Sequence, residues 1–437
     1  MNRPCSLPIS ILLLLLFFSS LAAAQSYSVT TIGVASPRAI DSNGNVAGVF
    51  EGSKKPPEEN AFLWTKTGGL QNLGTLGGGG NDSAAFGINA SGQVVGQANS
   101  SAGSPDDPFL WTQSAGMIDL GNLGGSGGVA NAINASGQVA GQSNRANGYA
   151  HAFLWTESAG MRDLGTLSGG QQSGANAINS AGEIAGWANV GSNDAAIIWT
   201  QSAGLVNLGI NASCGATAFG INDSAEVVGW FNNSGSCTFT SHGFSWTESG
   251  GFKDLGVLSG GQYSFAYGIN SLGQTVGTGD SSTSAPVALL WTADGKVHNL
   301  NTLISSKTRI LVAANAINNA GQIVADATTV TGSGAYAVLL TPIMETALAS
   351  SLNPSKAGQA VTFTATVSSI VGAPPNGELV TFKSGATVLG TGALAKGVAT
   401  FTTSSLTLGK YKIIAIYAGD KIYASSKSAL LTQVVTK

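Results

Sequence analysis

Charged residues are scarce in this chain, and they show no excess of one sign. Only 9 % of the 437 residues are Asp, Glu, Lys or Arg, and the net charge is −3. The sequence therefore lacks the basic surface with which proteins bind nucleic acid or anionic membranes. This composition does not indicate disorder, because apolar residues make up 43 % of the chain and recur in order.

Long apolar runs are missing except at the amino terminus. Arg3 precedes an apolar run from Ile9 to Leu21, and three alanines follow before Gln25. This pattern predicts a secretory signal peptide, residues 1–24, with cleavage between Ala24 and Gln25. No later segment approaches the roughly 20 apolar residues of a membrane span. We therefore expect a secreted, extracellular or cell-surface protein with no membrane span.

Cysteine is almost absent. Of three cysteines, Cys214 and Cys237 remain after the predicted cleavage, and they flank the predicted hairpin 219–230. Because hairpin ends are neighbours and exported proteins fold in an oxidising compartment, we predict a disulfide between them, worth about 3 kcal/mol. Two buried free thiols are the alternative.

What the chain has in abundance is an internal repeat. Seven times an Ile is followed by Asn or Asp, a short turn and a small apolar run, as in GINASGQVVG, residues 87–96. The turns open at Asp41, Asn89, Asn134, Asn179, Asn222, Asn270 and Asn318, with spacings of 43 to 48 residues. A period in this range predicts stacked copies of one supersecondary unit.

Each copy is predicted to contain four short strands. The third strand carries a Trp in six copies, and the fourth carries Asn-Leu or Asp-Leu, usually followed by Gly. We expect the Trp residues to pack between neighbouring sheets and the Asp or Asn to make a turn hydrogen bond. One turn, Asn222 to Ala225, has Ala where the others have Gly, and it is predicted to be strained or of another type.

The seventh copy lacks its fourth strand, and an unassigned strand precedes the first copy. Residues 28–33, SVTTIG, have the position of a fourth strand. This displacement predicts a ring closed by its own ends, so residues 25–343 are predicted to form a seven-bladed β-propeller closed by the N-terminal strand. An open β-solenoid is the alternative.

Residues 344–437 have a different pattern, with about seven short alternating strands, which predicts an immunoglobulin-like β-sandwich. Phrases such as residues 358–363, GQAVTF, and 417–420, YAGD, resemble bacterial immunoglobulin-like domains. The repeats resemble the HAF-repeat family of bacterial extracellular proteins, whose His-Ala-Phe phrase occurs here at His151. The resemblance implies an exported bacterial repeat protein and brings no established activity.

Patterns that carry catalysis or metal binding are missing. His151, His242 and His298 lie in different copies without other ligands at metal spacing, and we expect surface or edge positions for them. The glycine-rich stretches, such as residues 77–80, lack the Lys and the helix of a phosphate site. We therefore predict no catalytic residues, no metal and no cofactor.

The predicted function is that of a non-enzymatic binding or adhesion scaffold at the cell surface or in the extracellular matrix. Loops that differ between copies would carry the contacts, and their polar, neutral-to-acidic residues suit carbohydrate or another exported protein. The candidate binding residues are Asn81, Asp82, Gln171, Gln172, Gln262 and Tyr263, with Asp106 and Asp107 nearby in the repeat.

Two alternatives remain at this stage. A polysaccharide-degrading hydrolase or lyase would need carboxylates that converge from different copies, and Glu183 and Glu226 share one repeat position. A purely structural surface component would need no ligand at all.

Overall fold

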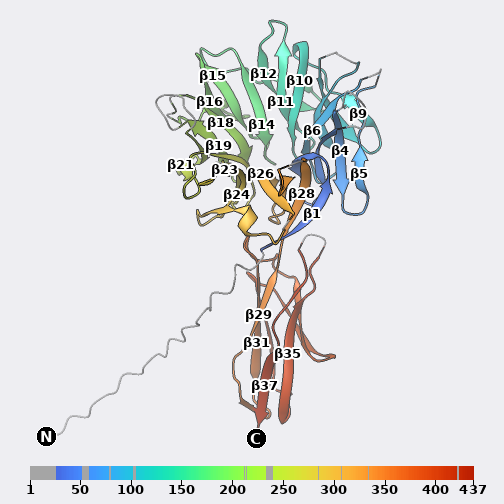
Figure 1. Ribbon diagram of the computed structural model, residues 1–437, viewed down its shortest axis with the longest axis vertical. Coiled ribbons are helices and arrows are strands. Elements are labelled where there is room, and N and C mark those ends of the chain that lie inside the picture. The colour runs from blue at the N-terminus through green and yellow to red at the C-terminus, as the bar shows by residue number, and fades with distance from the viewer. Residues whose placement is uncertain are drawn as a thin grey trace, which may run out of the picture.

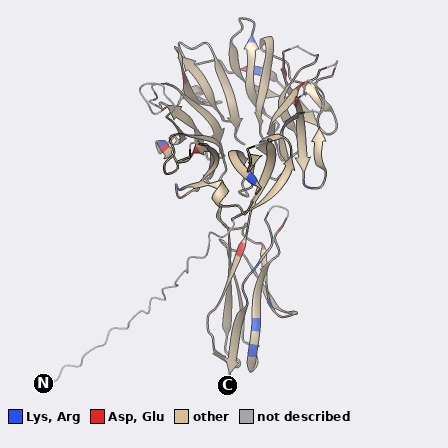
Figure 2. Cartoon of the chain, in the orientation of Figure 1, with Lys and Arg blue, Asp and Glu red and all other residues tan. Residues whose placement is uncertain are grey.

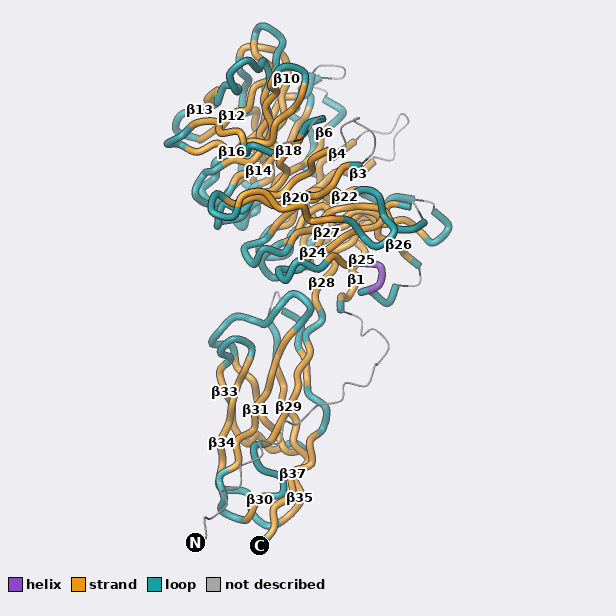
Figure 3. The backbone as a smooth tube through the Cα atoms, turned by 90° about the vertical axis from the view of Figure 1, so that its left-hand side faces the viewer, coloured by secondary structure: helices purple, strands orange, loops and turns teal. Residues whose placement is uncertain are grey.

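Strands dominate the computed structural model (Figures 1 and 3). The described residues are 26–51, 59–77, 80–101, 105–210, 212, 214–232, 240–283, 285–306, 308–332, 334–420 and 423–437. Within them the one helical element is a single 3₁₀ turn, η1 (Leu300–Thr302). The all-β prediction is thus confirmed. The predicted signal peptide with its Ala24–Gln25 cleavage point, and Cys237 of the predicted disulfide with Cys214, lie outside the described residues and stay predictions.

Each repeat forms one four-stranded antiparallel sheet, as predicted. Sheets 1 to 3 consist of β2 (Ser36–Ile40), β3 (Val46–Glu51), β4 (Glu59–Thr65) and β5 (Gly69–Asn72); β6 (Ser83–Ile88), β7 (Val94–Ala98), β8 (Asp107–Thr112) and β9 (Gly116–Asp119); and β10 (Gly124–Ile133), β11 (Val139–Arg145), β12 (Ala150–Thr156) and β13 (Gly160–Asp163).

Sheets 4 to 6 follow the same order along the chain. They consist of β14 (Ser173–Ile178), β15 (Ile184–Val190), β16 (Asn193–Thr200) and β17 (Gly204–Asn207); β18 (Ala216–Ile221), β19 (Val227–Asn232), β20 (Ser241–Thr247) and β21 (Gly251–Gly256); and β22 (Ser264–Ile269), β23 (Thr275–Asp280), β24 (Pro286–Trp291) and β25 (Val297–Asn299).

The seventh sheet takes its fourth strand from the beginning of the chain. It contains β26 (Arg309–Ile317), β27 (Ile323–Thr329) and β28 (Tyr336–Pro342), and β1 (Tyr27–Gly33) pairs antiparallel with β28. The displaced strand therefore has the partner that the sequence predicted for it.

The turn between the first and second strands links each sheet to the next. In sheet 2, Asn89 Oδ1 accepts the backbone N–H groups of Ser91 and Gln93, which closes the turn. Its Nδ2 donates to the backbone oxygen of Asn134 in sheet 3 at 3.1 Å. The same donation runs at 3.0 to 3.2 Å from Asn134 to Asn179, Asn179 to Asn222, Asn222 to Asn270, Asn270 to Asn318 and Asn318 to Asp41.

Asp41 is the exception in this series, because a carboxylate has no N–H to donate. Here the neighbouring Asn43 makes the link, with its Nδ2 donating to the backbone oxygen of Ala90 at 3.1 Å. The turn Asn thus has a second role, between sheets, that turn geometry alone does not predict.

The Trp of the third strand packs between neighbouring sheets, as expected. Trp111 lies in a cluster with Ala47 and Leu63 of sheet 1, and Trp199 lies with Ala140 and Leu154 of sheet 3. Trp64, Trp111, Trp199 and Trp291 are all buried. The bulk of each indole therefore fills the space between two sheets.

The Asp or Asn of the fourth strand makes the predicted turn hydrogen bond. Its Oδ1 accepts the N–H of the residue two positions later at 2.7 to 3.0 Å in all six copies, namely Asn72, Asp119, Asp163, Asn207, Asp254 and Asn299.

The prediction of a surface or edge position is wrong for His151, which is only 5 % exposed. Its Nδ1 lies 2.8 Å from Asp163 Oδ1, so the imidazole is buried against the fourth strand of its own sheet.

Residues 345–436 form a two-sheet sandwich, which confirms the immunoglobulin-like prediction. One sheet contains, in this order, β29 (Glu345–Ser350), β31 (Val361–Ser368) and β34 (Val398–Thr403). The other contains β30 (Ser355–Lys356), β37 (Leu431–Thr436), β35 (Gly409–Tyr417), β32 (Leu379–Ser384) and β33 (Thr387–Ala393), with β36 (Ser426–Lys427) beside β35. Phe363, Phe382 and Tyr417 lie in the core between them.

The sandwich attaches to the repeat sheets at the turns of sheets 6 and 7 (Figure 1). Val371, from the loop between β31 and β32, is buried in one cluster with Ile317 and Ile323. Gln274 Nε2 donates to the backbone oxygen of Val371 at 2.7 Å. A buried apolar contact and a buried hydrogen bond thus fasten the two modules together.

Replacing Asn134 by Asp tests the links between sheets. The variant should lose about 1–3 kcal/mol of unfolding free energy, because a buried carboxylate cannot make the donations of Asn134 Nδ2 to the Asn179 oxygen and to Gln138 Oε1, and the Asn179 oxygen keeps only the N–H of Gly182. Urea denaturation measures the change. Asn147→Asp is the matched control, since Asn147 is exposed and uses only its Oδ1, which accepts from Tyr149. Equal stability of both variants would contradict the role of the link.

Ala225 confirms the predicted strain of its turn, with φ at +57° where the other copies use Gly. Ala225→Gly should therefore raise the unfolding free energy by about 0.5–1 kcal/mol, because Gly adopts this conformation without the Cβ penalty. Gly92→Ala is the reverse control, since a Cβ there would meet nothing within 4 Å. Denaturation midpoints that shift the same way in both variants would refute this explanation.

Candidate functional site

The predicted binding residues lie on the face of the repeat module that is opposite the Asn turns. We call this face the rim. Asn81–Asp82, Gln171–Gln172 and Gln262–Tyr263 each precede the first strand of sheets 2, 4 and 6. In each pair both backbone N–H groups donate to one side-chain oxygen at 2.6 to 3.1 Å, which belongs to Asn99, Asn189 or Asp280. The pairs are thus held by the end of the second strand, and each belongs to a separate sheet.

The rim carries an acidic corner in sheet 2. Gln97 Nε2 donates to Asp106 Oδ2 at 2.7 Å, and Asp82 is close enough to act on Asp106 electrostatically. Burial, followed by the charge of Asp82, raises the pKa of Asp106. Burial also raises the pKa of Asp107, next to it. The ionised carboxylates therefore oppose folding at this corner.

Asp106→Asn should raise the thermal midpoint at pH 7. The folded-state pKa of Asp106 is raised, so its ionised form destabilises the fold fully above that pKa, and the effect disappears as pH falls below the unfolded value. Asn retains the acceptor for Gln97. The gain should therefore vanish at pH 3, as thermal unfolding at both pH values would show. A gain of equal size at pH 3 would contradict the electrostatic cause.

A second polar region lies where the first strands of all seven sheets meet. Each first strand has a register shift against the second strand, so that one residue has no partner and forms a β-bulge. The bulged residues are Arg38, Phe86, Asn131, Asn176, Phe219, Tyr267 and Asn315.

The last Gly of the repeated phrase permits this bulge. A Cβ on Gly96 would lie 1.9 Å from the backbone oxygen of Ala84, and the equivalent glycines of sheets 1 and 3 to 6 are as crowded. The second strand can therefore approach the bulged strand only without a side chain there. In sheet 7 Ala325 takes this position, and β26 has an additional register shift.

All seven bulged residues line one cavity of about 460 Å³, together with Ala313 and Asp326. We call it the seven-sheet pocket. Its size is in the range of small-molecule sites. Arg38 and Asp326 both act on the phenol of Tyr267, whose pKa is raised mainly by burial. The pocket thus combines aromatic rings, amides and one charge of each sign.

The amides in the seven-sheet pocket present acceptors. Asn131 and Asn176 donate from Nδ2 to the backbone oxygens of Ala175 and Ala218, at 2.8 Å each. Asn315 donates to Pro37 and to Asp326 Oδ2. Because a backbone oxygen can only accept, each Nδ2 is fixed and each Oδ1 remains an acceptor. Asp326 Oδ1 is buried without a hydrogen-bond partner among the described residues.

Sequence reasoning missed this pocket because the repeated phrase was assigned to architecture. The signal was nevertheless present. Three positions before each turn Asn or Asp, the seven copies read Arg, Phe, Asn, Asn, Phe, Tyr and Asn, while the following Ala or Gly and Ile are constant. A variable position inside a constant phrase is what a ligand-contacting residue on a repeated frame would produce.

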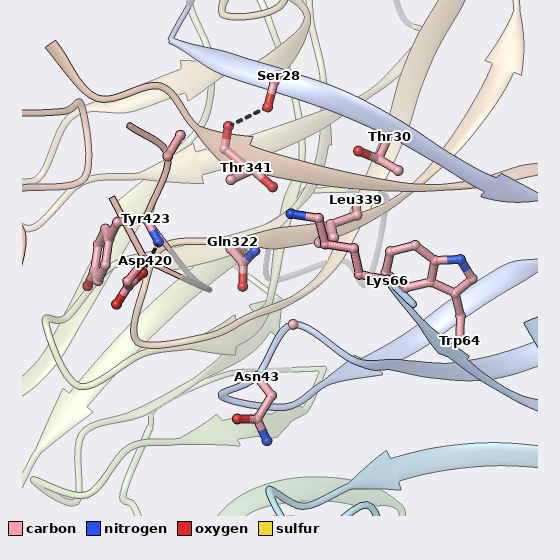
Figure 4. A pocket seen from close by; sticks show the side chains of 12 residues that line it. Ser28, Thr30, Asn43, Trp64, Lys66, Gln322, Leu339, Thr341, Asp420 and Tyr423 are labelled. Atoms are coloured by element: carbon pink, nitrogen blue, oxygen red, sulfur yellow. Dashed lines mark hydrogen bonds between the residues drawn. The ribbon is translucent and has the colours of Figure 1, made fainter. Parts of the chain in front are cut away.

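A smaller cavity of about 250 Å³ lies at the junction of the two modules (Figure 4). Trp64 and Lys66 lie on one side of it, and Asp420 and Tyr423 of the sandwich lie on the other, with Gln322 between them. Of the seven repeat sheets, sheets 1 and 7 contribute to its lining. The cavity lies on the face of the Asn turns. Its lining belongs to the attachment between modules.

Glu183 and Glu226, the two glutamates that share one repeat position, lie away from the seven-sheet pocket. Glu183 Oε2 accepts from the turn residue Asn179 at 2.7 Å. Glu226 lines a cavity beside Lys253, and burial raises its pKa. Both positions are on the turn face. Among the described residues no group of three or more His, Cys, Asp or Glu could hold a metal ion.

Figure 2 shows few charged residues on either module. In the part of the chain that the structure describes, no helix has the length and apolar character to cross a membrane.

Comparison with known families identifies only the terminal module. Residues 348–436 match the bacterial Ig-like domain (group 3). The resemblance of the repeats to the HAF-repeat family stays a prediction. No curated protein matches the chain.

Several solved structures are similar at low identity. TolB from Acinetobacter baumannii is 17 % identical, with 52 % of this chain and 53 % of that chain covered and a TM-score of 0.37. The chain thus matches about half the length of TolB. The extracellular domain of the hybrid two component system BT4673 from B. thetaiotaomicron is 9 % identical, with 94 % and 60 % covered and a TM-score of 0.44. AofleA from Arthrobotrys oligospora is 12 % identical, with 64 % and 93 % covered and a TM-score of 0.38.

Proposed function

We propose that the protein is an exported binding scaffold: a seven-bladed β-propeller, closed by β1, that takes a carbohydrate ligand in the seven-sheet pocket and is carried on the immunoglobulin-like module. The observation that carries this proposal is the convergence of one bulged residue from each of seven sheets on one cavity. A closed ring of sheets accounts for that convergence, and an open solenoid would spread the seven residues along its length.

Closure is supported by contacts between the seventh and the first sheets. Asn318 Nδ2 donates to the backbone oxygen of Asp41, and Asn315 Nδ2 donates to that of Pro37. These bonds repeat the links between consecutive sheets elsewhere. The seventh sheet is thus bonded to the first in the same way as each other sheet is bonded to the one that follows it.

The chemistry of the lining favours a ligand rich in hydroxyl groups. The three Asn Oδ1 atoms and the Asp326 carboxylate accept hydrogen bonds, and the sugar hydroxyls can donate them. Phe86, Phe219 and Tyr267 offer apolar surface for the C–H faces of a sugar ring. The second ligand class that the sequence suggests is another exported protein, and a cavity of this size suits it less well than it suits a sugar.

A binding role agrees with the lining better than hydrolysis does. Glycoside hydrolysis commonly uses two carboxyl groups about 5 to 10 Å apart. Asp326 is the one carboxylate among the residues that line the seven-sheet pocket. Export and surface location agree with the bacterial Ig-like module and with the predicted signal peptide.

Retention on insoluble cellulose, chitin, xylan and peptidoglycan tests the proposal. The wild-type protein should be retained on at least one of them without releasing reducing ends. Ala313→Trp should weaken retention about tenfold or more, because the indole fills the pocket without removing a side-chain hydrogen bond. Phe86→Trp, at another lining position, provides a second plug if the first variant folds poorly.

Val206→Trp is the control, since Val206 is exposed on the outer strand β17. Retention on none of the four polysaccharides would contradict the proposal. Equal retention of the plugged variants and the control would contradict the pocket as its site.

A further inference from the structure

Five aromatic side chains form a continuous strip along sheets 5 and 6. We call Tyr263, Phe265, Tyr267, Phe219 and Trp230 the aromatic strip. The ring centroids of Tyr263 and Phe265 lie 5.8 Å apart, and those of Phe265 and Tyr267 lie 6.4 Å apart. Phe219 meets Tyr267 at 5.6 Å, and Trp230 meets Phe265 at 5.9 Å. Each ring therefore contacts at least one other ring of the strip, and Trp230 branches from Phe265.

The aromatic strip runs from the rim into the seven-sheet pocket. Tyr263 directly precedes β22, Phe265 lies on it and Tyr267 is its bulged residue, and the two ring contacts bring the three side chains together on one side of the sheet. Tyr263 belongs to a rim pair held by Asp280, whereas Tyr267 and Phe219 line the pocket. The extended backbone from Tyr263 to Tyr267 covers about 13 Å, which is longer than a single sugar ring.

Core packing does not account for these aromatics. All five are half-buried, whereas Phe62, Phe109, Phe153 and Phe244 on the third strands are fully buried. At the repeat position of Phe265 the other sheets carry small or β-branched residues, which are Ser36, Ala84, Val129, Gly174, Thr217 and Ala313. The frame therefore does not require an aromatic there, and a contiguous, partly exposed apolar patch indicates a contact surface.

The surroundings of the aromatic strip decide which polymer fits it. The neighbouring amides of Asn131 and Asn176 offer acceptors, so the occupant must carry donors. A proline-rich peptide also favours aromatic grooves but has few N–H groups. A single-stranded nucleic acid stacks on aromatics but requires a basic groove, and this chain has a net charge of −3.

The two tyrosines add donors to the aromatic strip. Burial raises the pKa of Tyr267 and of Tyr263, so both phenols keep their protons at neutral pH. The occupant thus meets aromatic faces, phenol donors and amide acceptors along one line.

We propose that the aromatic strip is the binding track of a linear glycan, with the sugar rings placed against successive aromatic faces and one end of the chain in the seven-sheet pocket. This inference rests on the proposed function and makes it more specific. The ligand is an extended oligosaccharide rather than a single sugar, and it enters from the rim, on the face opposite the immunoglobulin-like module.

Isothermal titration with matched sugars tests the track. The probes are cellohexaose, chitohexaose and xylohexaose with their monosaccharides, and decaproline as the competing class. At least one hexasaccharide should bind about 100-fold more tightly than its monosaccharide, because several aromatic contacts add up along the strip. Phe265→Ala and Tyr267→Ala should each weaken hexasaccharide binding about tenfold.

Tyr263→Ala, at the rim, should weaken hexasaccharide binding and leave monosaccharide binding unchanged. Tyr149→Ala is the matched control, since Tyr149 is exposed and lies outside the aromatic strip. Thermal midpoints near that of the wild type establish that the variants are folded. If Phe265→Ala or Tyr267→Ala does not fold, Tyr263→Ala still tests the track.

Three results would overturn the track. If a hexasaccharide binds no more tightly than its monosaccharide and Ala313→Trp blocks both, the proposed function stands and the track fails. If the aromatic-strip variants bind the hexasaccharide as the Tyr149 control does, the track also fails. Binding of decaproline in place of every sugar would overturn both the track and the carbohydrate ligand.

Discussion

The repeat module depends on one polar contact, the donation from the side chain of each turn Asn to the backbone of the next turn. The Asn residues are nearly fully buried, so each N–H would be costly without its acceptor. One side chain closes its own turn through Oδ1 and fixes the neighbouring sheet through Nδ2. Apolar packing between sheets is tolerant of small rotations, whereas a hydrogen bond at about 3 Å is not. The polar contacts therefore set the angle between sheets, and the Trp residues fill the space which that angle leaves.

This division of roles also explains how a site can vary on a constant frame. The Asn sets the turn, the final Gly of the phrase admits the bulge, and the bulged residue is turned toward the cavity. None of the three functions depends on what the bulged side chain is. Arg38, Phe86 and Asn131 can therefore occupy equivalent positions without any change in the sheets that carry them. The frame thus accepts different bulged residues, and an Asn at this position adds a hydrogen bond to the next sheet.

Much of the fold could be predicted from the sequence, because its signals are local and repeated seven times. The strands, the buried Trp residues, the turn role of residues such as Asp163 and the strain at Ala225 all follow from residue chemistry over a few positions. The links between sheets could not be predicted, because the sequence of a turn closed by Asn is the same whether or not the Asn Nδ2 donates to the neighbouring sheet. His151 was misplaced for a similar reason, since its partner Asp163 is 12 residues away on the next strand.

The candidate site was predicted only in part. The rim residues were predicted because loops differ between copies, and the structure places one of them, Tyr263, at the outer end of the aromatic strip. The inner residues escaped because their direction depends on a bulge, which is a property of two strands and not of one. A strand pattern predicts alternation, and a bulge shifts it by one residue.

The pairing of β1 with β28 has a consequence for how the chain comes to be folded. Ser28 bonds to the backbone of Thr341, 313 positions away, so the seventh sheet is incomplete until nearly the whole repeat region exists. Contacts of such long range are slow to form, since the loop that they close is large. Late completion of the last sheet means that the repeat module acquires its final stability only after β28, at its far end, has been made and has paired with β1.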